Sequence, residues 1–182
     1  MEVQKTYISG LYIIQPTIYE DSRGYFFESF KEDEFNKKIM PVDFIQENQS
    51  KSCYGVIRGL HFQKPPFDQA KLVRCTKGSV LDVAVDIRRG SPTYGQFFSI
   101  RLSEQNHTQL FIPRGFAHGF SVLTNEAIFE YKCQLPMAKA HGLVIPARLG
   151  LHTIGPLARA CHTRTTNLRL SEARSSMGVC FF

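Results

Sequence analysis

The chain has 182 residues, of which 43% are hydrophobic and 21% are charged. This length and composition predict one folded domain, or at most two small ones, and exclude an intrinsically disordered protein. No apolar run approaches the roughly 18 residues that a membrane-spanning helix needs, so we expect no membrane partner. The first ten residues lack the charged-then-apolar pattern of a signal peptide, and we therefore expect a cytoplasmic protein.

The net charge of +6 is unevenly distributed along the chain. Residues 1–133 hold 16 Lys and Arg against 15 Asp and Glu, whereas residues 134–182 hold 6 against 1. A groove for nucleic acid interleaves cationic and aromatic side chains, which the basic segment does not do, so we expect no nucleic-acid partner. The change in charge balance after residue 133 predicts a core domain over residues 1–133 and an atypical basic tail of uncertain structure over residues 134–182.

The first 133 residues are typical of short strands separated by turns. Strands are predicted over 11–14, 25–30, 43–49, 56–63, 70–76, 80–87, 95–102, 108–112, 119–123 and 127–133. The single predicted helix covers 31–38, with Phe35 as its apolar anchor, and a turn is predicted over 21–24. The run 80–87 is nearly continuously apolar, which is typical of a strand covered on both faces. Strands at this spacing favour an all-β sandwich or barrel.

Two histidines lie among glycine and arginine residues. His61 belongs to the run 58–63 (RGLHFQ), and His118 belongs to 113–120 (PRGFAHGF). Glycine lets a backbone approach a ligand closely, and arginine can bind phosphate through two hydrogen bonds. A structural histidine and a histidine in a functional site are equal alternatives here. No H-x-H pair or paired cysteine spacing accompanies them, so we expect no metal site and reduced cysteines.

Charged and phenolic residues on the predicted strands are further candidates. Lys71 and Arg74 are three residues apart and point to opposite faces. One alternative is that one of them faces a cavity and the other faces solvent or a partner, and the other is that Lys71 is an ordinary solvated lysine. Tyr131 is either a core residue or a proton donor with a tuned pKa.

Asp82 and Asp86 are four residues apart and therefore share a face of their predicted strand. A buried carboxylate needs a partner. One alternative is that such a carboxylate accepts the ring N–H of His61 or His118, and the other is a salt bridge with Arg88.

Several motifs occur in the order found in a known family. They are the runs 21–28, 46–50, 58–63, 71–75, 82–88, 91–95, 113–120 and 130–133. Together they resemble the dTDP-4-dehydrorhamnose 3,5-epimerase family, over residues 1–133. The resemblance implies an all-β fold, a double-stranded β-helix (cupin or jelly-roll barrel), and a homodimer that needs no metal or cofactor. The implied reaction is the epimerisation of dTDP-4-dehydro-6-deoxy-D-glucose at C3 and C5 to dTDP-4-dehydro-L-rhamnose, in dTDP-L-rhamnose and O-antigen biosynthesis.

The resemblance also implies roles for individual residues. His61 is the implied base and Tyr131 the implied acid, while Lys71 stabilises the enolate oxygen, since a cation placed where charge develops lowers the barrier. The implied substrate-binding residues, which contact the nucleotide and the sugar, are Arg23, Phe26, Glu28, Gln46, Glu47, Asn48, Arg58, Lys71 and His118.

The resemblance stops after Cys133. The family has a late Ser-x-Lys-Asp motif whose Asp partners the catalytic histidine, and the run 171–174 (SEAR) places Arg at that position. One hypothesis is that residues 134–182 are translated in a shifted reading frame and are poorly ordered, because synonymous codons for 149–156 can be chosen to give a family-like Gly-Ile-Ala-Tyr-Asp-Trp-Pro. The rival hypothesis is a diverged tail.

Two further functions remain as alternatives at this stage. One is a 3-epimerase or 3,4-ketoisomerase that acts on a similar dTDP-sugar. The other is a non-catalytic cupin that binds a dTDP-sugar without turnover, if the altered tail abolishes activity.

Overall fold

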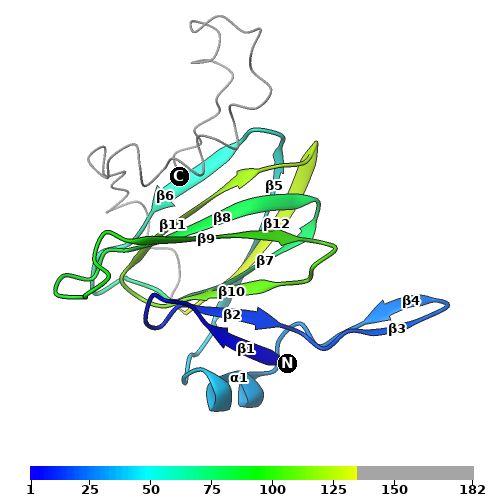
Figure 1. The fold of residues 1–182 in the computed structure, drawn as a ribbon, viewed down its shortest axis with the longest axis horizontal. Helices are drawn as coiled ribbons and strands as arrows, with labels where there is room; N and C mark the ends of the chain where they lie inside the picture. The colour runs from blue at the N-terminus through cyan, green and yellow to red at the C-terminus, as the bar shows by residue number, and fades with distance from the viewer. Residues whose placement is uncertain (135–182) are drawn as a thin grey trace, which may run out of the picture.

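The computed structural model describes residues 1–134, which form strands apart from one short helix (Figure 1). Helix α1 covers Glu32–Lys38. The strands are β1 (Glu2–Lys5), β2 (Tyr12–Gln15), β3 (Tyr19–Asp21), β4 (Gly24–Phe26), β5 (Gln46–Cys53), β6 (Ile57–His61), β7 (Lys71–Lys77), β8 (Ser79–Asp86), β9 (Phe97–Ser103), β10 (Gln109–Ile112), β11 (Phe116–Val122) and β12 (Glu126–Cys133). Within this described part, no helix is long and apolar enough to cross a membrane. The expectations for residues 135–182 lie outside the described residues.

Two antiparallel sheets and a separate hairpin contain all of these strands. The larger sheet has the order β1-β2-β10-β7-β12-β5, the smaller one has the order β6-β11-β8-β9, and β3 pairs with β4 alone. Consecutive strands repeatedly cross from one sheet to the other, as β7 to β8 and β11 to β12 do. Two facing antiparallel sheets with such crossings form the double-stranded β-helix of the cupin or jelly-roll class, so the predicted fold class is confirmed.

The main core lies between the two sheets. Val73 of β7 and Phe129 of β12 are at most 1% exposed and contact residues of the smaller sheet, where Phe120 stacks on Phe129 with ring centroids 4.2 Å apart. Side chains alternate between the faces of a strand. Lys71 and Tyr131, each two residues from one of these core residues, therefore lie on the same inner face.

Helix α1 covers the outer face of the larger sheet. Its central residue Phe35 is 1% exposed and packs with Ile14, Leu72 and Phe111. Acidic residues in the first turn and lysines in the last turn suit the helix dipole. The predicted helix and its anchor are confirmed, and β8, whose residues are buried at seven of eight positions, confirms the prediction of a doubly covered strand.

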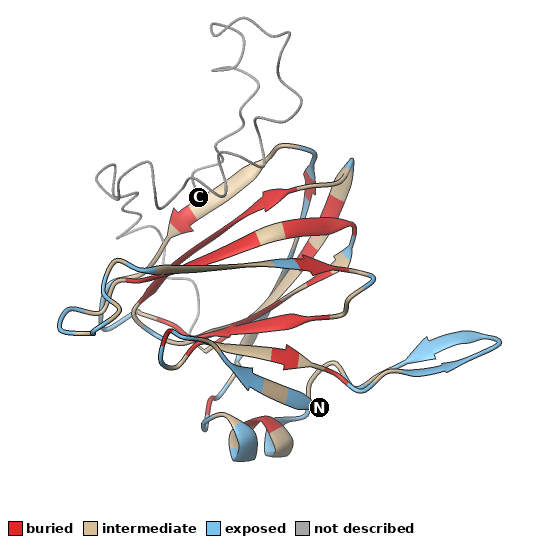
Figure 2. Ribbon diagram, viewed as in Figure 1, coloured by how far each residue is buried: buried red, intermediate tan, exposed pale blue. Residues whose placement is uncertain are grey.

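The strand predicted over 25–30 is wrong beyond Phe26. Phe30 instead packs against Phe35 and Phe44, and Phe27 packs against the ring of His107. These aromatic side chains hold the segment between β4 and α1 in place by packing. A strand-like composition therefore occurs here without the backbone hydrogen bonds of a strand. Strands β1 and β3 are short and polar, and no apolar alternation predicts them. The turn at 21–24 is confirmed, because it closes the β3–β4 hairpin, which is exposed throughout (Figure 2).

The turn between β7 and β8 provides a test of this packing. Gly78 has a φ of +72°, and a Cβ there would overlap the carbonyl oxygen of Glu126 and the hydroxyl of Thr124. Gly90 has a similar φ of +87°, but a Cβ there would meet no atom within 4 Å. We expect Gly90→Ala to lower the free energy of unfolding by about 1–2 kcal/mol, the cost of left-handed backbone. Gly78→Ala should lose about 1–3 kcal/mol more through overpacking. Urea unfolding of both variants measures the difference, and equal losses would contradict the packing.

Candidate active site

A group of titratable side chains replaces the apolar core at one part of the interior. We call this group the inner cluster; it comes from β6, β7, β8, β11 and β12 and consists of His61, Lys71, Asp82, His118, Tyr131 and Cys133. Strand register brings its members together, because His61 pairs with His118 across β6 and β11, and Lys71 pairs with Cys133 across β7 and β12. The two sheets thus bring together all three predicted catalytic residues.

The shortest contact in the cluster between predicted catalytic residues joins Lys71 and His61. Lys71 Nζ lies 3.1 Å from His61 Nε2, which is hydrogen-bond distance. The same ammonium group lies 5.8 Å from the centre of the Tyr131 ring. Lys71 is therefore close to both groups for which the family resemblance implies opposite proton-transfer roles.

Burial controls the protonation of His61 and Lys71. Burial, followed by the charges of Lys71 and His118, lowers the pKa of His61 well below 6.5. Burial also lowers the pKa of Lys71, while the charges of Cys133 and Asp82 act in the opposite direction. At neutral pH the imidazole is therefore unprotonated and can accept a hydrogen bond or a proton at Nε2.

Tyr131 is shifted in the opposite sense. Burial, with a smaller contribution from Cys133, raises the pKa of its phenol above 10, and the charge of Arg58 partly opposes this. The phenol therefore keeps its proton at neutral pH. The cluster thus pairs an unprotonated base with a protonated acid, which is the division that general acid–base catalysis requires.

The two carboxylates of β8 have different partners. Asp82 is fully buried, and its Oδ2 lies 2.8 Å from Nε2 of His118. Asp86 is also fully buried but binds Arg88, Ser91 and Thr93 within its own loop. Each sequence alternative is therefore realised by a different residue, with Asp82 on the histidine and Asp86 on the arginine.

The prediction for the charged pair of β7 is confirmed as well. Lys71 lies in the inner cluster, while Arg74 donates to Glu130 Oε2 at 2.7 Å on the outer face of the larger sheet.

Three predicted substrate-binding residues adjoin the cluster. Asn48 donates from Nδ2 to the Cys133 sulfur at 3.7 Å, and Gln46 donates to Asn48 Oδ1 at 2.8 Å. Arg58 donates to Ser52 Oγ at 2.9 Å, and its charge acts on Tyr131. His118 belongs to the cluster itself.

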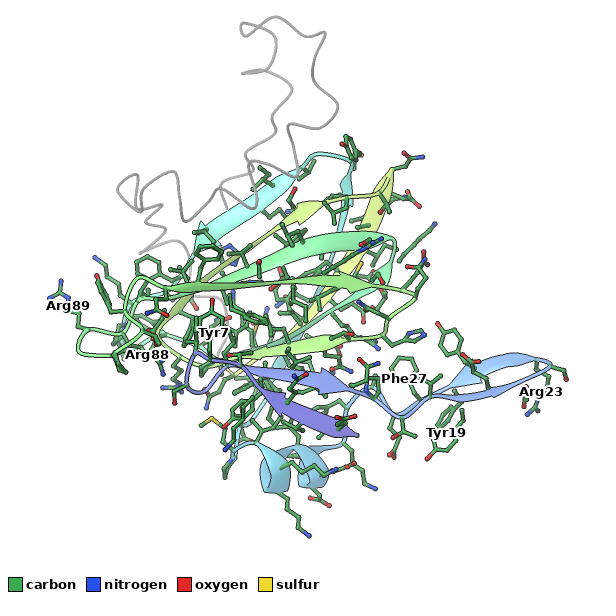
Figure 3. All side chains as sticks on the ribbon, viewed as in Figure 1. Tyr7, Tyr19, Arg23, Phe27, Arg88 and Arg89 are labelled. Carbon is green, nitrogen blue, oxygen red and sulfur yellow. The ribbon has the colours of Figure 1, made fainter. Side chains whose placement is uncertain are left out.

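The other predicted substrate-binding residues are exposed at the surface of this chain. Glu47, between Gln46 and Asn48, points to the opposite face of β5 and pairs with Lys132 at 2.8 Å. Glu28 is exposed. Phe26 is 66% exposed, and Arg23 lies at the tip of the hairpin, where its nearest ion-pair partner is Asp21 (Figure 3).

Cys133 is a member of the cluster that sequence reasoning missed. Burial raises the pKa of its thiol, and the charge of Lys71 and the hydrogen bond from Asn48 lower it. Its spacing of two from Tyr131 on a strand is the signal that places both side chains on one face. Among the described residues, no three His, Cys, Asp or Glu side chains gather as a metal site would require.

The contact between Lys71 and His61 gives a testable titration. In Lys71→Met the pKa of His61 should rise, because the second-largest cause of its depression is removed, yet it should stay below 6.5 because burial remains. Two-dimensional ¹H–¹⁵N NMR of the imidazole nitrogens measures this titration. Lys77→Met, a change on the same strand at an exposed ion pair with Glu126, should leave His61 unchanged. An unaltered His61 titration in Lys71→Met would rule out the coupling.

Comparison with known proteins shows the family of the chain. The sequence profile described as dTDP-4-dehydrorhamnose 3,5-epimerase matches residues 5–148, so the resemblance extends beyond Cys133. A protein of that name from Shigella flexneri is 52% identical over 133 residues, which cover 72% of this chain and 74% of the relative.

Solved structures agree with this assignment. An epimerase from Legionella pneumophila in complex with dTDP-4-keto-L-rhamnose has a TM-score of 0.72 and 48% identity, covering 74% of this chain and 71% of its own. A 3′-monoepimerase from Streptomyces bikiniensis in complex with dTDP-quinovose has a TM-score of 0.75 and 30% identity, covering 93% and 84%. With its cupin fold, its inner cluster and these matches, the chain belongs to the dTDP-4-dehydrorhamnose 3,5-epimerase family.

Proposed function

We propose that this chain epimerises dTDP-4-dehydro-6-deoxy-D-glucose at C3 and C5 to dTDP-4-dehydro-L-rhamnose. The single observation that carries the proposal is the 3.1 Å contact between Lys71 Nζ and His61 Nε2. It places a cation and an unprotonated base side by side, as proton abstraction next to a ketone requires. The family membership supports the identity of the substrate.

The contact gives Lys71 two successive partners. Its ammonium group donates to His61 Nε2, which occupies the lone pair that the base needs. When the sugar binds, its C4 ketone oxygen can accept the same N–H, and the Nε2 lone pair becomes available for a proton on C3 or C5. The enolate oxygen that forms then lies against the ammonium group, where one such donor contributes about 10²–10³ in kcat.

Proton return follows from the opposite pKa shift of Tyr131. Carbon loses its proton to His61, and the electron pair of the C–H bond passes to the C4 oxygen as the enolate forms. Tyr131, whose phenol is protonated at neutral pH, then gives a proton to carbon from the other face and becomes a phenolate. Exchange with water restores both side chains, so the cycle is balanced without a co-reactant.

A 3-epimerase activity remains the second candidate. It is favoured by the likeness to the 3′-monoepimerase, although the identity to that protein is lower than to the 3,5-epimerases. The number of carbon positions that exchange hydrogen distinguishes the two. The absence of a cofactor and a cytoplasmic location stay predictions, as does the division into a domain over residues 1–133 and a tail.

We further infer that two copies of the chain form the working enzyme. Arg23 and Phe26 lie on the β3–β4 hairpin, which projects from the opposite side of the barrel to the end of β6 that carries His61 (Figures 1 and 3). They cannot reach the inner cluster of their own chain from there. If both bind substrate, as the family resemblance implies, a second copy must bring its hairpin to this site, which a symmetric dimer would do twice.

Deuterium incorporation in D₂O tests the proposed chemistry. The wild-type chain should introduce deuterium at both C3 and C5 of the 4-keto sugar, whereas exchange at C3 alone would favour the 3-epimerase. His61→Ala should abolish exchange at both positions, because no base remains. Tyr131→Phe should keep exchange with retained configuration but lose inversion, because His61 can still return a deuteron to the face it came from.

NMR of the sugar protons measures position and configuration together. Binding without exchange in the wild-type chain would support the non-catalytic module. Normal exchange in a folded His61→Ala variant would exclude His61 as the base.

Mixed dimers test the role of the hairpin. Arg23→Ala and His61→Ala should each be nearly inactive alone. After the two variants are mixed and subunits exchange, each hybrid has one site with an intact His61 and an intact hairpin. Activity should therefore return to roughly a quarter of the wild-type value for random pairing of a symmetric dimer. The control mixes Arg23→Ala with a double variant that carries both Arg23→Ala and His61→Ala. No chain in that mixture has an intact hairpin, so activity should not return. Failure of the first mixture to recover would show that the hairpin does not complete a partner's site.

A further inference from the structure

Asp82 differs from the other buried carboxylate of the described residues. It is fully buried, its Oδ2 contacts His118 Nε2 at 2.8 Å, and its Oδ1 has no hydrogen-bond partner within residues 1–134. Asp86, four residues along the same strand, has both oxygens bound, by Arg88, Ser91 and Thr93. A buried carboxylate with an unsatisfied oxygen is costly to the fold, and this favours a role beyond stability.

We propose that Asp82 is a positioning residue of the site: its carboxylate fixes His118 with the proton on Nε2 and provides the negative charge that faces the Lys71 ammonium group. This inference rests on the proposed epimerase function for its kinetic consequences. The contacts on which it is built are independent of that function.

The first part of the role follows from the hydrogen bond. Carboxylate oxygens only accept, so the hydrogen between Asp82 Oδ2 and His118 Nε2 belongs to the imidazole. In the neutral ring Nδ1 then carries no proton, and this buried nitrogen has no partner among the described residues. The ring of His118 lies edge to face with that of His61, with centroids 5.6 Å apart and planes at 73°. A fixed His118 therefore holds the base beside Lys71 and offers Nδ1 as an acceptor.

The second part follows from charge. A line of contacts joins Asp82 to Lys71: Asp82 Oδ2 lies 2.8 Å from His118 Nε2, the rings of His118 and His61 lie edge to face, and His61 Nε2 lies 3.1 Å from Lys71 Nζ. The charge of Cys133, followed by that of Asp82, raises the pKa of Lys71 against the effect of burial. Lys71 must be protonated to bind an enolate oxygen, so Asp82 extends the pH range over which the cluster is active. Among the described residues, the titratable groups linked directly to Asp82 are His118 on β11 and Lys71 and Cys75 on β7. His61 on β6 and Tyr131 and Cys133 on β12 surround Lys71, while Arg58 acts on Tyr131 and Glu104 acts on Cys75.

Asp82→Asn tests the proposal, because it keeps the shape of the side chain and removes its charge. We expect kcat to fall about 10- to 100-fold with little change in KM. Losses of this size follow when a metal-binding histidine in other proteins loses the carboxylate that orients it. The alkaline limb of the kcat–pH profile should move to lower pH, since Lys71 loses its proton earlier without the negative charge. A purely structural role would lower stability but leave that limb in place.

Asp86→Asn is the matched control. It removes a buried carboxylate from the same face of the same strand, and it should lower the free energy of unfolding while leaving the alkaline limb unchanged. A shift of the limb in Asp86→Asn as large as that in Asp82→Asn would overturn the proposal, as would an unchanged profile in Asp82→Asn.

A measurement on the wild-type chain keeps the proposal testable if Asp82→Asn does not fold. The ¹⁵N shifts of His118 distinguish its two tautomers, and we expect the proton on Nε2 at neutral pH. A proton on Nδ1 alone would overturn the proposal. This readout needs no turnover, so it separates an error about Asp82 from an error about the proposed function, which the absence of hydrogen exchange in the wild-type chain would reveal.

Discussion

The burial of one ammonium group, that of Lys71, is the constraint on which the inner cluster depends. A charge removed from water must be compensated by hydrogen bonds and opposite charge. Here the compensation comes from the lone pair of His61 Nε2 and from the charges of Cys133 and Asp82. Burial is the main cause of the lowered pKa of His61, and the charge of Lys71 lowers it further, since the imidazole cannot easily gain a second positive charge beside the first. The contact between the two residues therefore helps both to stabilise the lysine and to keep the base unprotonated.

Strand alternation joins this chemistry to the core of the barrel. Along β7 the inner face changes from Val73 to Lys71, and along β12 it changes from Phe129 to Tyr131, within two residues in each case. A slip of one residue in either strand would turn the polar group outward and an outer residue inward. The stacked rings of Phe120 and Phe129 therefore do more than fill space. By fixing the register of β12 against the smaller sheet, they fix where the phenol of Tyr131 stands.

Local pattern predicted the helix with Phe35, the doubly covered strand β8 and the opposed faces of Lys71 and Arg74. It failed where tertiary contacts decide. Phe27 and Phe30 give their segment the composition of a strand, yet Phe30 packs on the helix and Phe27 packs on His107. The motif 46–48 reads as one binding unit, but alternation sends Glu47 to the outer face while Asn48 contacts Cys133. The distance between His61 and Lys71 depends on how two sheets face each other, which no periodicity encodes.

The two carboxylates of β8 show how one strand serves stability and function separately. Both are fully buried on the same face, and both follow from one sequence pattern. Asp86 lies where the strand ends, so its own loop folds back and supplies Arg88, Ser91 and Thr93 to its oxygens; these hydrogen bonds outweigh burial and hold the pKa of this carboxyl below its usual range. Asp82 lies further inside the sheet, opposite Phe120, and no loop within residues 1–134 binds its oxygens. Its partner is instead His118 of the neighbouring strand β11. Position along the strand, rather than residue type, therefore makes Asp86 a residue that stabilises the fold and Asp82 a residue of the inner cluster.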